Sequence, residues 1–151
     1  MNSTPFKDQA RFMASTGQHT RGATPEQYLL YKNLVEEEVK ELGEALMAHE
    51  EFVQRTFEDL SDDELDELVR LSAETTKEAI DVLVVVMGLV YSMGINLGSA
   101  WKEVYLSNMS KLGEDGTPIR REDGKILKGP NYKEPDMIGV VKRSWGMTDG
   151  A

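Results

Sequence analysis

Two groups of acidic side chains stand at spacings that would bring their oxygens together. The first group is Glu37, Glu38 and Glu41, and the second is Glu78 and Asp81. Residues three or four apart share one face of a helix, so the acids of each group converge if both segments are helical. Apolar residues flank both groups, which places the acids at the edge of a core. Like charges held this close destabilise one another unless cations offset them.

The ligand chemistry of these groups points to hard divalent cations. The chain has no cysteine, and its two histidines, His19 and His49, lack a partner at metal-ligand spacing, so we expect both on the surface. Oxygen-only ligands suit Mg²⁺ or Mn²⁺. Glu74, one helical turn before Glu78, is a further candidate. The simpler alternative is a solvated acidic helix face, which shows the same spacing without binding a metal.

A second set of residues has the groups that bind an anionic nucleotide. Asn108 and Lys111 are three apart on an expected helix, so both can face one anion. Lysines also flank a Gly-Pro turn whose backbone N–H groups could meet phosphate, although solubility alone also explains exposed lysines. The candidate substrate-binding residues are Asn108, Lys111, Lys125, Lys128, Asn131, Tyr132 and, near the N-terminus, Gln18.

Charge and composition exclude several classes of protein. The chain has 151 residues and a formal net charge of −10, and residues 36–81 hold 17 acids against four Lys or Arg. General nucleic-acid binding and anionic-membrane binding depend on clustered cations, so we expect neither partner. The longest apolar stretch, Val82–Tyr91, is half the length of a spanning helix. With no secretory signal visible, we expect one acidic, cytoplasmic domain over residues 1–151.

The elements that must position these side chains are expected to be helices. The patterns predict helices over 5–15, from Pro25 to about 53, from a Ser61–Glu64 capping box to Tyr91, and from Asn96 to Leu112. The apolar run Val82–Tyr91 would also suit a buried strand, but no turn signal separates it from the helix before it. On that helix, the residues expected to face the core are Leu65, Leu68, Val69, Ser72, Thr76 and Ile80.

The C-terminal third of the chain differs in composition from the helical segments before it. Residues 113–133 are rich in turn residues, and Asp123-Gly124 between short apolar pairs predicts a small hairpin. A last short helix is expected over 136–143. Trp101 and Trp145 are interpreted as core or interface residues. The uncharged stretch Val82–Ala100 has more apolar surface than one layer of helices can cover, which favours a homo-oligomer.

The two acidic groups on consecutive long helices resemble the all-α nucleoside triphosphate pyrophosphohydrolases of the MazG type. The N-terminal pattern Phe12-Met13-x-x-x-Gly17-Gln18 is similar to a signature of the phosphoribosyl-ATP-pyrophosphohydrolase-like branch. Residues 107–112, Ser-Asn-Met-Ser-Lys-Leu, and 121–132, Arg-Glu-Asp-Gly-Lys-Ile-Leu-Lys-Gly-Pro-Asn-Tyr, are similar to the C-terminal signature of that branch. The 36 residues between Glu41 and Glu78 exceed the usual separation, and we interpret His49–Asp63 as an insertion.

The resemblance implies an all-α helical bundle with a short C-terminal hairpin segment, assembled as a dimer or tetramer. It also implies two or three Mg²⁺ or Mn²⁺ ions per site. The implied metal ligands are Glu38, Glu41, Glu78 and Asp81, with Glu37 as a further ligand or as the base that orients the water. The implied catalytic residues are Glu37, Glu38 and Glu41. The reaction would convert a nucleoside triphosphate to its monophosphate and pyrophosphate.

Three functions follow as expectations. A purine (deoxy)nucleotide such as dGTP or GTP is the first expected substrate, because the C-terminal block looks closest to stand-alone nucleotide-pool enzymes, including phage-encoded MazZ-type members. A phage-encoded member would act in the host cytoplasm. Phosphoribosyl-ATP is the alternative substrate. The third hypothesis is a non-catalytic acidic helical protein that binds a partner or mimics DNA. A mimic would spread its acids along an outer face, whereas the acids here lie beside apolar residues.

Overall fold

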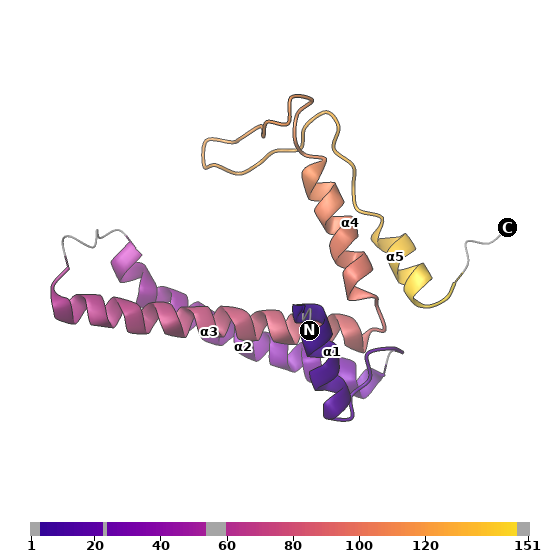
Figure 1. The fold of residues 1–151 in the computed structure, drawn as a ribbon, viewed down its shortest axis with the longest axis horizontal. Helices are drawn as coiled ribbons and strands as arrows, with labels where there is room; N and C mark the ends of the chain where they lie inside the picture. The colour runs from indigo at the N-terminus through magenta and orange to yellow at the C-terminus, as the bar shows by residue number, and fades with distance from the viewer. Residues whose placement is uncertain (1–3, 23, 54–59, 148–151) are drawn as a thin grey trace. The chain divides into compact units, whose positions relative to one another are not determined.

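The computed structural model describes residues 4–22, 24–53 and 60–147, and its regular elements are helices (Figure 1). An all-α fold is therefore confirmed. The chain divides into two compact units, one ending at Met93 and the other starting at Gly94. The prediction of a single domain over residues 1–151 stays a prediction. The helices are α1 (Pro5–Ser15), α2 (Pro25–Val53), α3 (Asp62–Ser92), α4 (Leu97–Met109) and α5 (Met137–Ser144).

The first unit is a hairpin of two long helices, α2 and α3, which lie side by side, with α1 packed on α3 (Figure 1). Its core contains Met13 from α1, Tyr31 from α2 and Val85 from α3. A Cβ at Gly88 would overlap the ring of Tyr31, so the missing side chain lets α2 and α3 approach closely. The hydroxyl of Tyr91 donates to the backbone oxygen of Phe6 at 2.9 Å and ties α1 to α3.

Helix α3 forms as its sequence predicts, and its two ends are fixed by local signals. Ser61 accepts from the backbone N–H of Glu64, whose side chain accepts from the backbone N–H of Ser61, so the capping box is present. The apolar run Val82–Tyr91 is helical rather than a strand. Gly94, with φ of +72°, follows the end of α3, because glycine enters the left-handed region without the clash of a Cβ.

The face that α3 buries differs from the predicted one. Of the residues expected to face the core, Val69 is 61% exposed and Ile80 is 51% exposed, and Leu65 and Thr76 are exposed too. The buried residues of α3 are Leu71, Glu78, Val85, Gly88 and Ser92. Apolar residues lie on both faces of α3. Their helical spacing therefore predicts that the segment is a helix, but it does not predict which face meets α2. Glu78 therefore lies on the line that faces the core.

The second unit pairs α4 with α5. Asn96 caps α4 by accepting from the backbone N–H of Ser99 at 2.9 Å, and Asp136 caps α5 by accepting from that of Gly139 at 2.8 Å. The backbone N–H of Asn96 donates to Ser144 Oγ at 3.0 Å. Helix α4 ends at Met109, three residues before the predicted end. The predicted hairpin reduces to one antiparallel bridge, between Arg120 and Ile126.

A serine clasp, formed by Ser107 and Ser110, holds the C-terminal loop against the end of α4. Ser107 Oγ donates to the backbone oxygen of Lys133 at 2.8 Å, and the backbone N–H of Lys133 donates to Ser110 Oγ at 2.8 Å. The backbone N–H of Gly129 donates to the oxygen of Lys111 at 3.2 Å. The bond to Lys111 occupies a backbone oxygen that a further turn of α4 would otherwise use, and the helix ends before this residue. Together, these bonds fix residues 129–133 in place.

Three other predictions meet different outcomes. The predicted insertion His49–Asp63 includes residues 54–59, which lie outside the described residues, while its two ends belong to α2 and α3. Trp101 and Trp145 are 62% and 55% exposed, so they are not core residues, and their role at an interface stays a prediction. Among the described residues, no single helix is both long enough and apolar enough to cross a membrane.

Candidate metal centre

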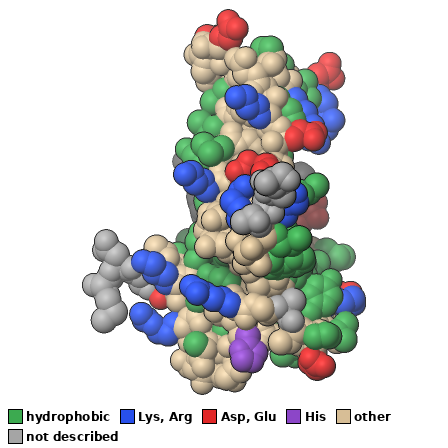
Figure 2. Space-filling view, turned by 90° about the vertical axis from the view of Figure 1, so that its right-hand side faces the viewer, with side chains coloured by type: hydrophobic (Ala, Val, Ile, Leu, Met, Phe, Trp, Pro, Cys, Tyr) green, Lys and Arg blue, Asp and Glu red, His purple; other side chains and the backbone are tan. Residues whose placement is uncertain are grey.

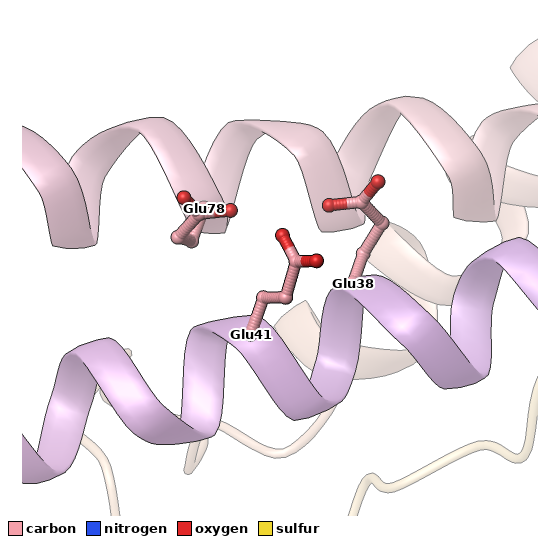
Figure 3. Close-up of side chains that lie close together, drawn as sticks. All are labelled: Glu38, Glu41 and Glu78. Atoms are coloured by element: carbon pink, nitrogen blue, oxygen red, sulfur yellow. The ribbon is translucent and has the colours of Figure 1, made fainter.

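Three carboxylates from the two long helices converge on one point. Glu38 and Glu41 project from α2 toward α3, and Glu78 projects from α3 toward them (Figure 3). Each offers one oxygen, and the three oxygens all lie within 4.8 Å of one another. A hard divalent cation binds oxygens at about 2.0–2.6 Å, so one ion fits among three oxygens at this separation with little movement. The helical spacing of the acids predicts this convergence.

The burial of these carboxylates supports a cation-binding role. Glu78 is 9% exposed, Glu38 is half-buried, and Glu41 is exposed. Oε2 of Glu38 and Oε2 of Glu78 are buried and accept no hydrogen bond from any described residue. A buried charged oxygen without a partner is costly, and native proteins rarely keep one without a reason. The donor set consists of carboxylate oxygens only, which is the set that Mg²⁺ and Mn²⁺ prefer.

The electrostatic field at this point is strongly negative. The pKa of Glu38 is raised above its usual range, chiefly because burial penalises the charged carboxylate. The negative charges of Glu41, Asp81 and Glu78 raise it further, and the positive charge of Lys77 partly opposes them. A divalent cation at the centre would remove this penalty.

Asp81 lies near the three carboxylates but is held by an ion pair. Its Oδ2 is 2.9 Å from Lys77 Nζ, and the same Nζ is 3.0 Å from Glu78 Oε1. These two hydrogen bonds raise the pKa of Lys77, with the bond to Asp81 the larger cause. Sequence reasoning missed Lys77. The signal that could have found it is the opposite charge four residues before Asp81.

Two other candidate ligands lie away from the group of three. Glu37 is exposed, since a step of one residue along α2 turns its side chain away from that of Glu38. Glu74 Oε2 accepts from Arg70 Nη1 at 2.9 Å, so its charge is already paired. The predicted roles of Glu37 and Glu74 at a metal stay predictions.

The two histidines, His49 and His19, each make hydrogen-bond contacts with other residues of the first unit. His49 is half-buried, with Nε2 3.2 Å from Ser72 Oγ, so only part of this side chain lies at the surface. The cause is the length of the hairpin, which continues beyond His49 and brings α3 across it. His19 is exposed, and its backbone N–H and oxygen are both bound by the side-chain amide of Gln27, at 2.8 and 2.6 Å.

Gln18 is the predicted substrate-binding residue of the first unit. Its Oε1 accepts from the hydroxyl of the buried Tyr31 at 2.6 Å. The bond fixes the orientation of the amide, so that its nitrogen is left to donate. The burial of Tyr31 also raises the pKa of its phenol, which keeps it a donor.

The other predicted substrate-binding residues lie in the second unit. Lys111 Nζ donates to Asn108 Oδ1 at 2.7 Å, so this pair is together as its spacing predicts. Lys128 Nζ is 4.3 Å from the ring centroid of Tyr132, a cation–π contact. Asn131 is exposed, and the backbone N–H of Lys125 donates to Asp123 Oδ1 at 3.1 Å. Their roles toward a substrate stay predictions.

Comparison with known proteins identifies the family. The family profile described as phosphoribosyl-ATP pyrophosphohydrolase matches residues 9–108. This segment contains Gln18, all the predicted metal ligands and Asn108, while the block 121–132 lies beyond it. No curated protein matches the chain at a significant level. Because the profile covers more than half of an all-helical chain, the chain belongs to the phosphoribosyl-ATP pyrophosphohydrolase family.

Proposed function

We propose that the chain is a metal-dependent nucleotide pyrophosphohydrolase, which converts a nucleoside triphosphate to its monophosphate and pyrophosphate. The observation that carries the proposal is the convergence of Glu38, Glu41 and Glu78, two of which have a buried oxygen without a partner among the described residues. The family supports a pyrophosphohydrolase activity in general. The metal and the substrate are our proposal.

The carboxylates would hold two or three Mg²⁺ or Mn²⁺ ions. Glu38, Glu41 and Glu78 are the proposed ligands, together with Asp81 once its carboxylate leaves Lys77. When bound, the ions supply the positive charge that lets an acidic site accept a triphosphate and that makes water acidic enough to react. Without them, the acids of residues 36–81 would repel the substrate.

Glu37 is the proposed residue that orients the water. This role is proposed on the resemblance to the family, since Glu37 is exposed and is not one of the three converging carboxylates. In the reaction, water adds across the anhydride bond between the α- and β-phosphoryl groups. A carboxylate accepts a proton of the water as the water oxygen bonds to the α-phosphorus. The bond between the α-phosphorus and the bridging oxygen breaks, and pyrophosphate leaves with that oxygen.

The proposed substrate is a purine (deoxy)nucleoside triphosphate such as dGTP or GTP, on the resemblance of the C-terminal block to nucleotide-pool enzymes. Phosphoribosyl-ATP is a second candidate, favoured by the description of the matching family. The proposed setting is the cytoplasm, or the host cytoplasm if a phage encodes the chain. The residues proposed to contact the nucleotide are Gln18, Asn108, Lys111, Lys125, Lys128, Asn131 and Tyr132.

A homo-oligomer, a dimer or a tetramer, is the proposed state of assembly. On α3, Val69, Ile80 and Leu83 are 61%, 51% and 55% exposed. Figure 2 shows hydrophobic side chains at the surface in several places on the face that it draws. Apolar patches of this kind commonly mark interfaces, and contact with a second copy would bury them.

The test is release of pyrophosphate from a panel of nucleotides. The panel contains dGTP, GTP, the other common triphosphates and phosphoribosyl-ATP, each with Mg²⁺, with Mn²⁺ and with EDTA. We expect turnover with the metals only. Glu41→Gln and Asp81→Asn should lower kcat by about 100-fold or more, because each loses a proposed ligand. Glu44→Gln is the matched control, since Glu44 is exposed, pairs with Lys40 and is not one of the three converging carboxylates.

Lys111→Ala separates binding from chemistry in the same assay. A lysine that binds phosphate equally in the ground and transition states affects KM more than kcat. We therefore expect a raised KM and a smaller loss of kcat. Equal turnover in EDTA would contradict the proposed metal dependence. Near-normal turnover of Glu41→Gln would contradict the proposed position of the centre and make Glu74 the next candidate ligand. No turnover of any nucleotide would favour a non-catalytic acidic protein.

A further inference from the structure

Lys77 places one of the chain's own positive charges at the edge of the proposed metal centre. Its Nζ contacts Glu78 Oε1 at 3.0 Å and Asp81 Oδ2 at 2.9 Å, so it occupies one oxygen of each of two proposed ligands. All three residues lie on α3 within little more than one turn. An ammonium group in this place offsets the negative charges of Glu78 and Asp81, which would otherwise repel each other.

The two sides of this contact differ in how easily they can move. The side chain of Glu78 is 11% exposed and is held in the interior of the hairpin. The side chain of Lys77 is 64% exposed and ends a flexible four-carbon stem. Lys77 can therefore leave the contact without any change to the core. A divalent cation bound to the same two carboxylates would repel the ammonium group and drive it away.

We propose that Lys77 is a displaceable counter-ion, which neutralises Glu78 and Asp81 in the metal-free protein and competes with a divalent cation for these two carboxylates. The inference rests on the proposed function, because it concerns the same site. The proposal has two consequences. The protein stays folded when no metal is bound, and metal binding requires a higher metal concentration than it would if Lys77 were absent.

The expected effects follow from thermodynamic linkage. Removing the positive charge takes away a competitor, so the affinity for metal rises, while the metal-free protein loses its counter-ion and becomes less stable. Since Lys77 is exposed to water, its contribution is that of a partly solvated ion pair. We expect Lys77→Gln to lower the Kd for Mn²⁺ by about two- to fivefold. We expect its melting temperature in EDTA to fall by about 2 °C.

The experiment measures Mn²⁺ binding by titration calorimetry and the melting temperature in EDTA, without nucleotide. Lys77→Arg keeps the charge and should behave like the wild type in both measurements. Lys40→Gln is the matched control: it removes the same charge two residues from Glu38, but its partner is Glu44, at 3.6 Å. Its Kd should equal that of the wild type within error.

Two outcomes would overturn the inference, and they are distinguishable. If the wild type binds Mn²⁺ and Lys77→Gln binds it with the same or lower affinity, Lys77 is not a competitor, while the proposed centre stands. If the wild type binds no Mn²⁺, the proposed centre fails and the inference falls with it. A lower Kd in Lys77→Gln alone, with a larger rise of melting temperature on adding Mn²⁺, supports the inference.

Discussion

At the scale of the residue, Glu38 makes the metal-free protein sensitive to pH. Burial, together with the charges of Glu41 and Asp81, raises its pKa above the ordinary value of 4.5. A carboxyl with a raised pKa binds its proton more tightly in the folded state than in the unfolded state. Its stabilising contribution is thus fully present below pH 4.5 and is lost as the pH rises through the folded pKa.

Glu38→Gln should therefore stabilise the protein in EDTA at pH 7, by about 1 kcal/mol, because it removes a buried charge whose oxygen lacks a partner. The gain should shrink as the pH falls and vanish below 4.5. Adding Mn²⁺ should stabilise the wild type and not the variant. Denaturant unfolding from pH 4 to pH 8, with EDTA and with Mn²⁺, measures all three effects. A variant less stable than the wild type at pH 7 in EDTA would contradict this account.

At the scale of the element, the position of a helix in the sequence is easier to predict than the face that it buries. The capping box at Ser61 and the stop at Gly94 are local signals, so they locate α3 from sequence. Which face meets α2 depends on contacts far away in sequence, such as Gly88 against the ring of Tyr31. The convergence of Glu38, Glu41 and Glu78 was predictable because it needs only two adjacent helices. The ion pair between Lys77 and Asp81 has the i, i+4 spacing of a helical pair, so it too was predictable from sequence.

The serine clasp yields a prediction for the C-terminal loop. A Cβ on Gly129 would lie 2.6 Å from the backbone oxygen of Lys111, so Gly129→Ala must push the loop off the end of α4. We expect a several-fold higher KM for the preferred nucleotide and faster hydrogen exchange at Lys133, whose N–H is in the clasp. Gly98→Ala is the control, since its Cβ would make only an ordinary contact, with Asn96 Oδ1 at 3.5 Å. Wild-type exchange at Lys133 in Gly129→Ala would contradict the prediction.

At the scale of the whole molecule, the exposed apolar side chains on α3 predict assembly. Leu83 is 55% exposed, and a charge there would be costly to bury in an interface. We expect light scattering to give the mass of a dimer or tetramer for the wild type at micromolar concentration. Leu83→Glu should lower that mass. Lys7→Glu, at an exposed position of α1, changes the net charge by more and should leave the mass unaltered.

Glu78 stands at a place where folding alone would choose a different residue. It lies on the buried line of α3 with Leu71 and Val85, and an apolar side chain there would fill the interior of the hairpin without any charge to satisfy. Replacing a buried charge by a well-packed apolar side chain is often stabilising by about 1–4 kcal/mol. Laboratory evolution that selects only for folded protein should thus enrich Leu or Met at position 78, and the same clones should have lost turnover. Under the proposed function, the carboxylate at position 78 serves metal binding at a cost in stability.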